Sequence, residues 1–175
     1  MLWGFLVKFI ILYRWQSSIK GAEQVTSMIA RLLADALETH GYDPWMDKKD
    51  LSITSTELKD SLSTAMDKTK VAVICIGVGD LARCSANDDF FRWEIDRTRA
   101  LETCGKPKVV VVVHGTHELE DLICGIEIDE RLRKRTFRSL GRWCTDFLDY
   151  LRNHYVMFFD INRLDDTAAQ IIQML

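Results

Sequence analysis

The fold is decided by residues 71–77, Val-Ala-Val-Ile-Cys-Ile-Gly, and by the loop and helix that follow them. Residues 71–76 form a short apolar run rich in β-branched side chains, which is typical of a strand buried on both faces of a parallel sheet. A polar loop then leads to a helix, with Asp88 and Asp89 among its candidate N-caps. Open α/β sheets bind ligands where a buried strand passes the chain to a helix. Glu94, in the first turns of this helix, is therefore the ionisable side chain that we expect in a functional site.

The rest of the chain alternates between strand and helix patterns. Further strands are predicted at 5–13, 42–46, 108–113 and 156–161, and further helices at 22–40, from about 55, at 131–153 and from about 165 to the end. Asp165, Asp166 and Thr167 are expected to cap the last helix. This order predicts one α/β domain over 1–175, with a doubly wound parallel sheet of five strands and helices on both faces.

Composition limits the classes of protein to which the chain can belong. Its 175 residues are 47% apolar and carry a net charge of −3, which indicates a globular domain without a general attraction to nucleic acid or to a membrane surface. Five widely spaced cysteines without a CxxC pair favour free thiols and a cytoplasmic location. Residues 1–12 are apolar, but Lys8 interrupts them and a membrane helix needs about 20 residues. We interpret residues 5–13 as the first strand, with a membrane anchor as the alternative.

Several kinds of catalytic site are not expected because their motifs are missing. The sequence has no GxGxxG after its first strand, no Walker A sequence and no GxSxG, which argues against a dinucleotide oxidoreductase, a P-loop enzyme and a serine hydrolase. His114 and His117 lie close together, but no further Cys or His has the spacing of a zinc ligand set, so no metal site is expected. The basic residues of 131–153 are interpreted as a solvated helix face.

With the strands placed, the sequence resembles the TIR (Toll/interleukin receptor) domain family over nearly its whole length. Residues 11–15, Ile-Leu-Tyr-Arg-Trp, stand where the family ends its first strand with a Ser-Tyr-Arg-like run. Residues 41–47 resemble the Gly–aromatic–strand–Asp second strand of the family, and 49–51 look like the start of its BB loop. Residues 89–101, with Trp-Glu-Ile at 93–95, resemble the tryptophan-and-glutamate helix after the third strand.

The resemblance implies a flavodoxin-like sheet of order 2-1-3-4-5. It also implies an activity. Many TIR domains cleave the nicotinamide–ribose bond of NAD⁺, giving nicotinamide and ADP-ribose or a cyclic variant, and Glu94 matches the catalytic glutamate of that group. One carboxylate is chemically sufficient, because nicotinamide is already a pyridinium cation in NAD⁺ and leaves as a neutral molecule without a general acid. NAD⁺ is then a substrate, and no cofactor is expected. The expected substrate-binding residues are Tyr13, Arg14, Trp15, Asp50, Leu51 and Gly77.

Each of these residues also has a purely structural interpretation. Glu94 can be a solvated helix residue, and Arg14 can be a structural salt-bridge partner. The tryptophans Trp15, Trp45 and Trp93 can be core side chains instead of stacking platforms.

The family also contains members that act without chemistry. A TIR signalling module in immune or cell-death pathways self-associates with other copies, commonly through its BB loop, here expected at Lys48, Lys49, Ser52, Ile53 and Thr54. The BB loop of the family usually has a glycine shortly after its acidic-Leu pair, and this sequence has Ile-Thr-Ser at 53–55 instead, which favours this alternative. A third interpretation is a related nucleoside-processing enzyme that uses one glutamate on a flavodoxin-like sheet.

Overall fold

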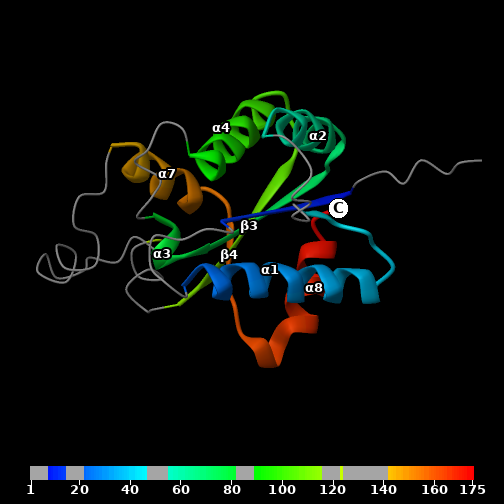
Figure 1. The fold of residues 1–175 in the computed structure, drawn as a ribbon. Helices are drawn as coiled ribbons and strands as arrows, with labels where there is room; N and C mark the ends of the chain where they lie inside the picture. The colour runs from blue at the N-terminus through cyan, green and yellow to red at the C-terminus, as the bar shows by residue number, and fades with distance from the viewer. Residues whose placement is uncertain (1–7, 15–21, 47–54, 82–88, 116–122, 124–141) are drawn as a thin grey trace, which may run out of the picture.

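In the computed structural model, five parallel strands form one sheet that lies between two layers of helices (Figure 1). The structure describes residues 8–14, 22–46, 55–81, 89–115, 123 and 142–175. The strands are β1 (Phe9–Tyr13), β2 (Trp45–Met46), β3 (Val71–Gly77), β4 (Lys108–His114) and β5 (Tyr155–Phe158). Their order is β2-β1-β3-β4-β5 and every pairing is parallel, which confirms the predicted flavodoxin-like order 2-1-3-4-5.

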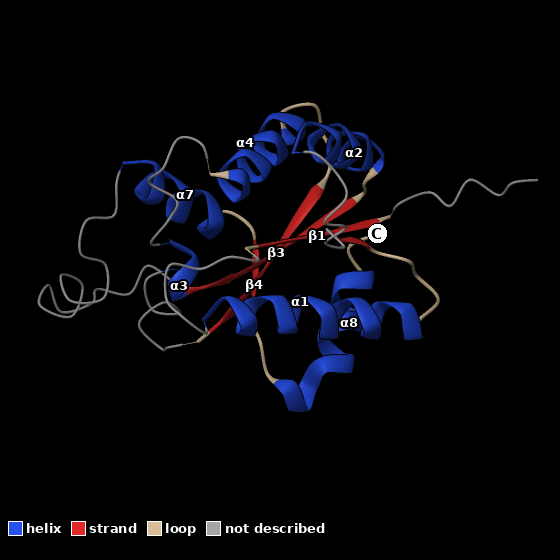
Figure 2. Ribbon diagram, in the orientation of Figure 1, coloured by secondary structure: helices blue, strands red, loops and turns tan. Residues whose placement is uncertain are grey.

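Helices cover both faces of the sheet (Figure 2). One face carries α1 (Ala22–Thr39) and α8 (Leu164–Ile172), and the other carries α2 (Ser55–Lys68), α4 (Phe90–Glu102) and α7 (Arg142–Arg152). Two short helices, α3 (Val78–Leu81) and the 3₁₀ helix η1 (Ile161–Arg163), follow β3 and β5. The first helix ends before Gly41, whose φ of 82° suits the left-handed turn predicted there.

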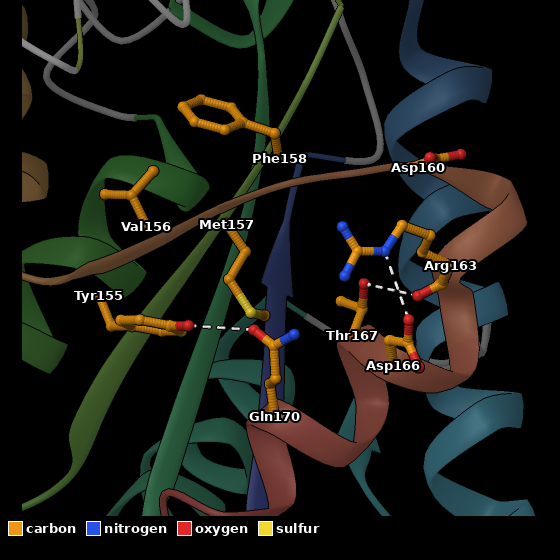
Figure 3. A pocket seen from close by; sticks show the side chains of 9 residues that line it. All are labelled: Tyr155, Val156, Met157, Phe158, Asp160, Arg163, Asp166, Thr167 and Gln170. Atoms are coloured by element: carbon orange, nitrogen blue, oxygen red, sulfur yellow. Dashed lines mark hydrogen bonds and ion pairs between the residues drawn. The ribbon is translucent and has the colours of Figure 1, made fainter.

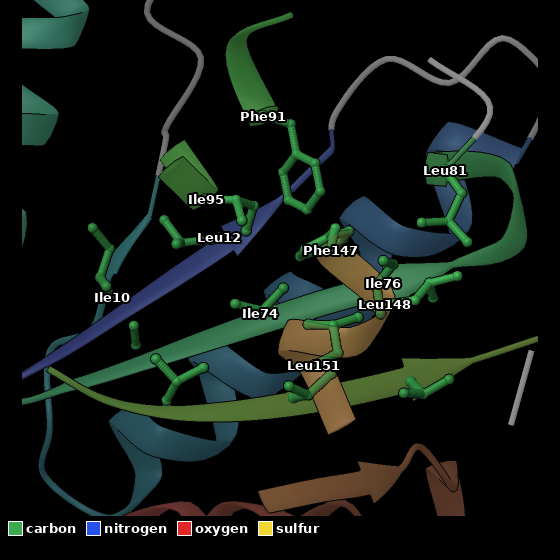
Figure 4. Close-up of a cluster of buried hydrophobic side chains, with 14 of the residues drawn as sticks. Ile10, Leu12, Ile74, Ile76, Leu81, Phe91, Ile95, Phe147, Leu148 and Leu151 are labelled. Atoms are coloured by element: carbon green, nitrogen blue, oxygen red, sulfur yellow. The ribbon is translucent and has the colours of Figure 1, made fainter. Parts of the chain in front are cut away.

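The core consists of two layers because side chains of each strand alternate between the faces. Ile74 and Ile76 of β3 pack with α2, α4 and α7, whereas Val73 and Cys75 pack with α1 and α8. Figure 4 shows the first of these layers, with side chains of β1, β3, α4 and α7 meeting over the sheet. All residues of β1 and β3 are buried, as the continuous apolar runs predicted.

The two outer strands are shorter than their sequence patterns suggested. The second strand contains only Trp45–Met46 of the predicted 42–46, and the fifth contains Tyr155–Phe158 instead of 156–161. Each pairs with one neighbour only. Pro44, directly before β2, has no amide hydrogen to donate to a neighbouring strand. Asp160 ends the fifth strand, because its side chain accepts a hydrogen bond from the Asn162 amide and starts η1.

The predicted capping of the last helix is wrong. The N-cap residue of α8 is Arg163, which makes no side-chain capping hydrogen bond, and Asp165 and Asp166 lie in the first turn. The reason is that η1 runs directly into α8, so the capping side chain is Asp160, one short helix earlier. Acidic side chains in the first turn still favour the helix through its dipole.

Two further predictions fall partly outside the described residues. Of the helix predicted at 131–153, the structure describes Arg142–Arg152. Residues 1–7, on which the anchor alternative depends, are also outside; among the helices that the structure describes, none is long and apolar enough to cross a membrane.

Candidate functional site

Arg14 lies directly after β1 and is almost completely buried, with 5% of its surface exposed. Its Nη1 and Nη2 atoms both pair with the carboxylate of Asp89, and the Nη2–Oδ1 distance is 2.7 Å. Its Nε donates to the main-chain oxygen of Asp80 at 3.1 Å. The guanidinium carbon also lies 5.2 Å from the ring centroid of Phe91. The salt-bridge interpretation of Arg14 therefore describes what the structure contains, whereas its contact with a substrate stays a prediction.

Asp89 connects this arginine to the helix that carries the predicted catalytic residue. It is the N-cap of α4, and its Oδ1 accepts a hydrogen bond from the Arg92 amide at 2.9 Å. Bidentate pairs of arginine and carboxylate have a fixed planar geometry. The same carboxylate thus ties the end of β1 to the first turn of α4.

Glu94 lies on the buried face of α4, with 4% of its surface exposed. That face consists of Phe91, Glu94, Ile95 and Thr98, whereas Phe90 and Trp93 are only half-buried. The interpretation of Glu94 as a solvated helix residue is therefore wrong. Glutamate is rarely buried to this extent in proteins unless it has a partner, and buried ionisable side chains are enriched at functional sites.

A second polar cluster lies at the ends of β3 and β4. The Thr26 hydroxyl, from α1, donates to Asp80 Oδ2 at 2.9 Å and lies 2.7 Å from His114 Nε2. The Asp80 Oδ2 also accepts a hydrogen bond from the Gly77 amide at 2.7 Å. Thr26, Asp80 and His114 are all buried, so this cluster joins α1 to the ends of two strands with little exposure to solvent.

Burial sets the protonation of this cluster. It raises the pKa of Asp80 to about 6, although the hydrogen bonds from Gly77 and Thr26 act in the opposite direction. Burial also lowers the pKa of His114, which keeps its imidazole neutral at pH 7. Since the Thr26 hydroxyl gives its proton to an ionised Asp80, it must accept one from His114 Nε2, so the imidazole carries its proton on Nε2.

Gly77 is required by this cluster for a steric reason. A Cβ atom added to it would lie 2.4 Å from Cε1 and 2.6 Å from Nε2 of His114. The sequence prediction placed Gly77 among the substrate contacts, and that role stays a prediction. The structure supplies an independent reason for a glycine here, the close approach of the imidazole.

The remaining predicted residues divide into two groups. Tyr13 is buried on the face of the sheet covered by α1, and Trp45 and Trp93 are half-buried and pack against the core on the other face, as their core interpretation states. The other group lies outside the described residues: Trp15, Lys48, Lys49, Asp50, Leu51, Ser52, Ile53 and Thr54.

The sequence did not predict that these buried polar groups lie together at the carboxyl ends of the strands. The sequence indicates Asp89 only as a candidate N-cap and assigns no role to His114, since no metal site is expected there. A usable signal existed, because Gly77 and His114 each end a buried strand, and carboxyl ends of parallel strands meet at one edge. Within the part of the chain that the structure describes, no group of three or more His, Cys, Asp or Glu side chains is placed to hold a metal ion.

A pocket of about 360 Å³ lies elsewhere, beside β5 (Figure 3). Its polar side chains pair with one another: Tyr155 donates to Gln170 at 3.0 Å, and Arg163 lies 3.3 Å from Asp166. The predicted site residues are not among those that line it, which are Tyr155, Val156, Met157, Phe158, Asp160, Arg163, Asp166, Thr167 and Gln170.

Comparison with known proteins identifies the fold of the chain and the family to which most of its sequence is similar. A family model for the TIR domain matches residues 21–140. No curated protein sequence matches the chain significantly. Among solved structures, the chain is similar to the TIR domains in the structure of the activated Roq1 resistosome directly recognizing the pathogen effector XopQ. The TM-score is 0.56 at 15% sequence identity, over 95% of this chain and 97% of that one, which is a likeness of fold.

Proposed function

Because the chain belongs to the TIR domain family, we propose that it is an NAD⁺ nucleosidase in which Glu94 is the catalytic carboxylate. The observation that carries this proposal is the burial of Glu94, 4% exposed, on the helix that follows the central strand β3. A buried carboxylate costs free energy, so a solvent-excluded glutamate at the ligand-binding edge of an α/β sheet favours a chemical role.

The reaction needs little from the protein besides charge and orientation. The bond between ribose C1′ and the nicotinamide nitrogen breaks, and its electron pair neutralises the pyridinium, so the leaving group needs no proton. Positive charge then develops on the ribose, and the carboxylate of Glu94 stabilises it by charge and by accepting hydrogen bonds from ribose hydroxyls. Water adds at C1′ and loses its proton to give ADP-ribose, or a group of the same nucleotide adds and gives a cyclic product.

The setting of this activity is also part of the proposal. The structural likeness is to TIR domains of an activated resistosome, which supports a role in immune or cell-death signalling. The cytoplasmic location is proposed from the five widely spaced cysteines without a CxxC pair. The structural likeness also supports homotypic self-association, for which residues 48–54 of the BB loop are the predicted surface. We do not expect nucleic acid or membrane among the partners, given the net charge of −3.

The test is nicotinamide release from NAD⁺ by the purified protein at high concentration. Glu94→Gln keeps the size of the side chain and removes its charge, and release should fall by a factor of about 10² to 10⁴. The matched control is Glu102→Gln, the same change two turns further along α4, where the carboxylate accepts a hydrogen bond from Tyr150. If the wild type releases nicotinamide and Glu94→Gln releases it equally fast, the catalytic residue is not Glu94.

The second candidate is a TIR module that signals by self-association without chemistry. It is favoured by the sequence of residues 53–55, which lacks the glycine usual in the BB loop of the family. This candidate predicts concentration-dependent assembly in sedimentation experiments, and no nicotinamide release even when assembly is forced on a support. Release that appears only upon assembly would unite the two candidates.

A further inference from the structure

We propose that Arg14 and Asp89 form a clamp that positions Glu94, so that Arg14 acts through helix α4 instead of binding the substrate. This inference rests on the proposed nucleosidase activity, and it assigns to that site two positioning residues. Arg14 and Asp89 are 75 residues apart in the sequence, and their side chains form an ion pair with little exposure to solvent.

All three nitrogen atoms of the Arg14 guanidinium group donate hydrogen bonds. Nη1 and Nη2 pair with the two carboxylate oxygens of Asp89, and Nε donates to the main-chain oxygen of Asp80. The arginine therefore holds both the short helix after β3 and the first residue before α4. A phosphate group would have to compete with Asp89 for the same donors, in a place where the arginine and aspartate side chains are only 6% and 9% exposed.

The carboxylate of Asp89 transmits this constraint to the helix. Its Oδ1 accepts from the Arg92 amide as well as from Arg14, so helix capping and ion pairing use the same atom. A capping side chain that is itself fixed by a second partner determines where the first turn of the helix begins. The end of β1 and the start of α4 are thereby joined through a single side chain.

Phe91 supplies the second connection. Its ring lies under the guanidinium of Arg14 and makes an edge contact with Phe147 of α7, with ring centroids 6.3 Å apart. Glu94 follows three residues later on the same buried face of α4. The clamp thus restrains both the position and the rotation of the helix turn that carries Glu94. Since a displacement of about 1 Å in a catalytic group can cost about 100-fold in rate, loss of the clamp should reduce kcat.

The experiment compares four variants by kcat, KM and thermal stability. Arg14→Gln and Asp89→Asn each leave one buried charge unpaired, and asparagine keeps the capping ability of aspartate. The double variant Arg14→Gln/Asp89→Asn removes both charges together. The control, Arg97→Gln, breaks the exposed ion pair between Arg97 of α4 and Asp67 of α2, where the N–O distance is 2.8 Å.

We expect kcat to fall about 10- to 100-fold in both single variants, with KM changed less than about threefold. The double variant should regain most of the lost thermal stability and little of the lost kcat, because a Gln–Asn pair lacks the bidentate geometry. Arg97→Gln should keep wild-type kinetics.

Two kinetic outcomes would overturn the clamp. If the double variant regains kcat together with stability, the pair serves stability only. If Arg14→Gln raises KM more than about tenfold at unchanged kcat while Asp89→Asn leaves KM as it was, Arg14 is a substrate ligand.

Amide hydrogen exchange tests the clamp independently of the proposed enzymatic activity. In Arg14→Gln, amide hydrogen exchange at Arg92 and Trp93 should become at least about tenfold faster than in Arg97→Gln, because the start of α4 loses its anchor. If the wild type releases no nicotinamide and this exchange still rises, the nucleosidase fails and the anchoring of α4 stands. Unchanged exchange overturns the clamp whether or not the protein is an enzyme.

Discussion

Two polar regions of this molecule each contain an ion pair, and the two ion pairs differ in their exposure to solvent. Where β1 ends, Arg14 and Asp89 form an ion pair whose side chains are 6% and 9% exposed. Beside β5, the Arg163–Asp166 pair lines an open pocket with side chains 65% and 64% exposed. Buried charges must be paired to be tolerated, whereas exposed ones are stabilised by water and contribute little by pairing. The open pocket is therefore the less informative of the two regions, and the structural constraint lies at the closed one.

The largest effect on stability is expected when one partner of the buried Arg14–Asp89 ion pair is removed. Asp89→Ala leaves the Arg14 guanidinium buried without its carboxylate and also removes the cap of α4. We expect the free energy of unfolding to fall by about 3–5 kcal/mol. Urea denaturation at pH 7.5 measures it. A loss below about 1 kcal/mol would show that the arginine finds another partner and that the pair is not a structural constraint.

A pH titration tests the neighbouring cluster. Burial raises the pKa of Asp80 to about 6 from an ordinary value of 3.8, so between these values the folded protein binds a proton that the unfolded chain has lost. This group therefore contributes stability at pH 4 that is lost as pH rises to about 6, up to about 3 kcal/mol. Other carboxylates titrate as well, so the measurement is the difference between wild type and Asp80→Asn across pH 4–7. A difference that does not change with pH would contradict the shift.

A somewhat smaller effect is expected from filling the space beside His114. In Gly77→Ala the new methyl group would meet the imidazole at 2.4 Å, and the ring is held in place by Thr26. We expect a loss of about 1–3 kcal/mol from overpacking, measured by thermal unfolding. Gly77→Ala in a His114→Ala background is the control. If the substitution costs the same in that background, the imidazole is not the cause.

The smallest effect is expected at the pocket beside β5. Arg163→Ala removes an exposed ion pair with Asp166, and the free energy of unfolding should change by less than about 0.5 kcal/mol. Chemical denaturation under the conditions used for Asp89→Ala gives the direct contrast. A loss above about 1.5 kcal/mol would mean that the two regions do not differ in the way proposed.

The local sequence pattern was sufficient for the architecture. Continuous runs of β-branched residues identified β3 and β4, because only strands buried on both faces are apolar at every position. The same reasoning was weaker at the sheet edges, where β2 and β5 are shorter than predicted, because Pro44 before β2 lacks an amide hydrogen and Asp160 after β5 starts η1. The fully buried positions of α4 are Phe91, Glu94, Ile95 and Thr98, and this face was not predicted, because the face that a helix buries depends on how it docks.

The sequence alone therefore determined the alternation of strands and helices and the choice of Glu94 as the residue of interest, whereas the sheet order was implied by the resemblance to the TIR family. These depend on hydrophobic periodicity and on motifs contained within short segments. Only the tertiary structure decided that Arg14 pairs with Asp89, and that Thr26, Asp80 and His114 share one hydrogen-bonded cluster. Such contacts join residues 54 to 88 positions apart, and no local pattern encodes them. They exist because parallel strands bring their carboxyl ends to one edge, where burial forces each polar group to find a partner.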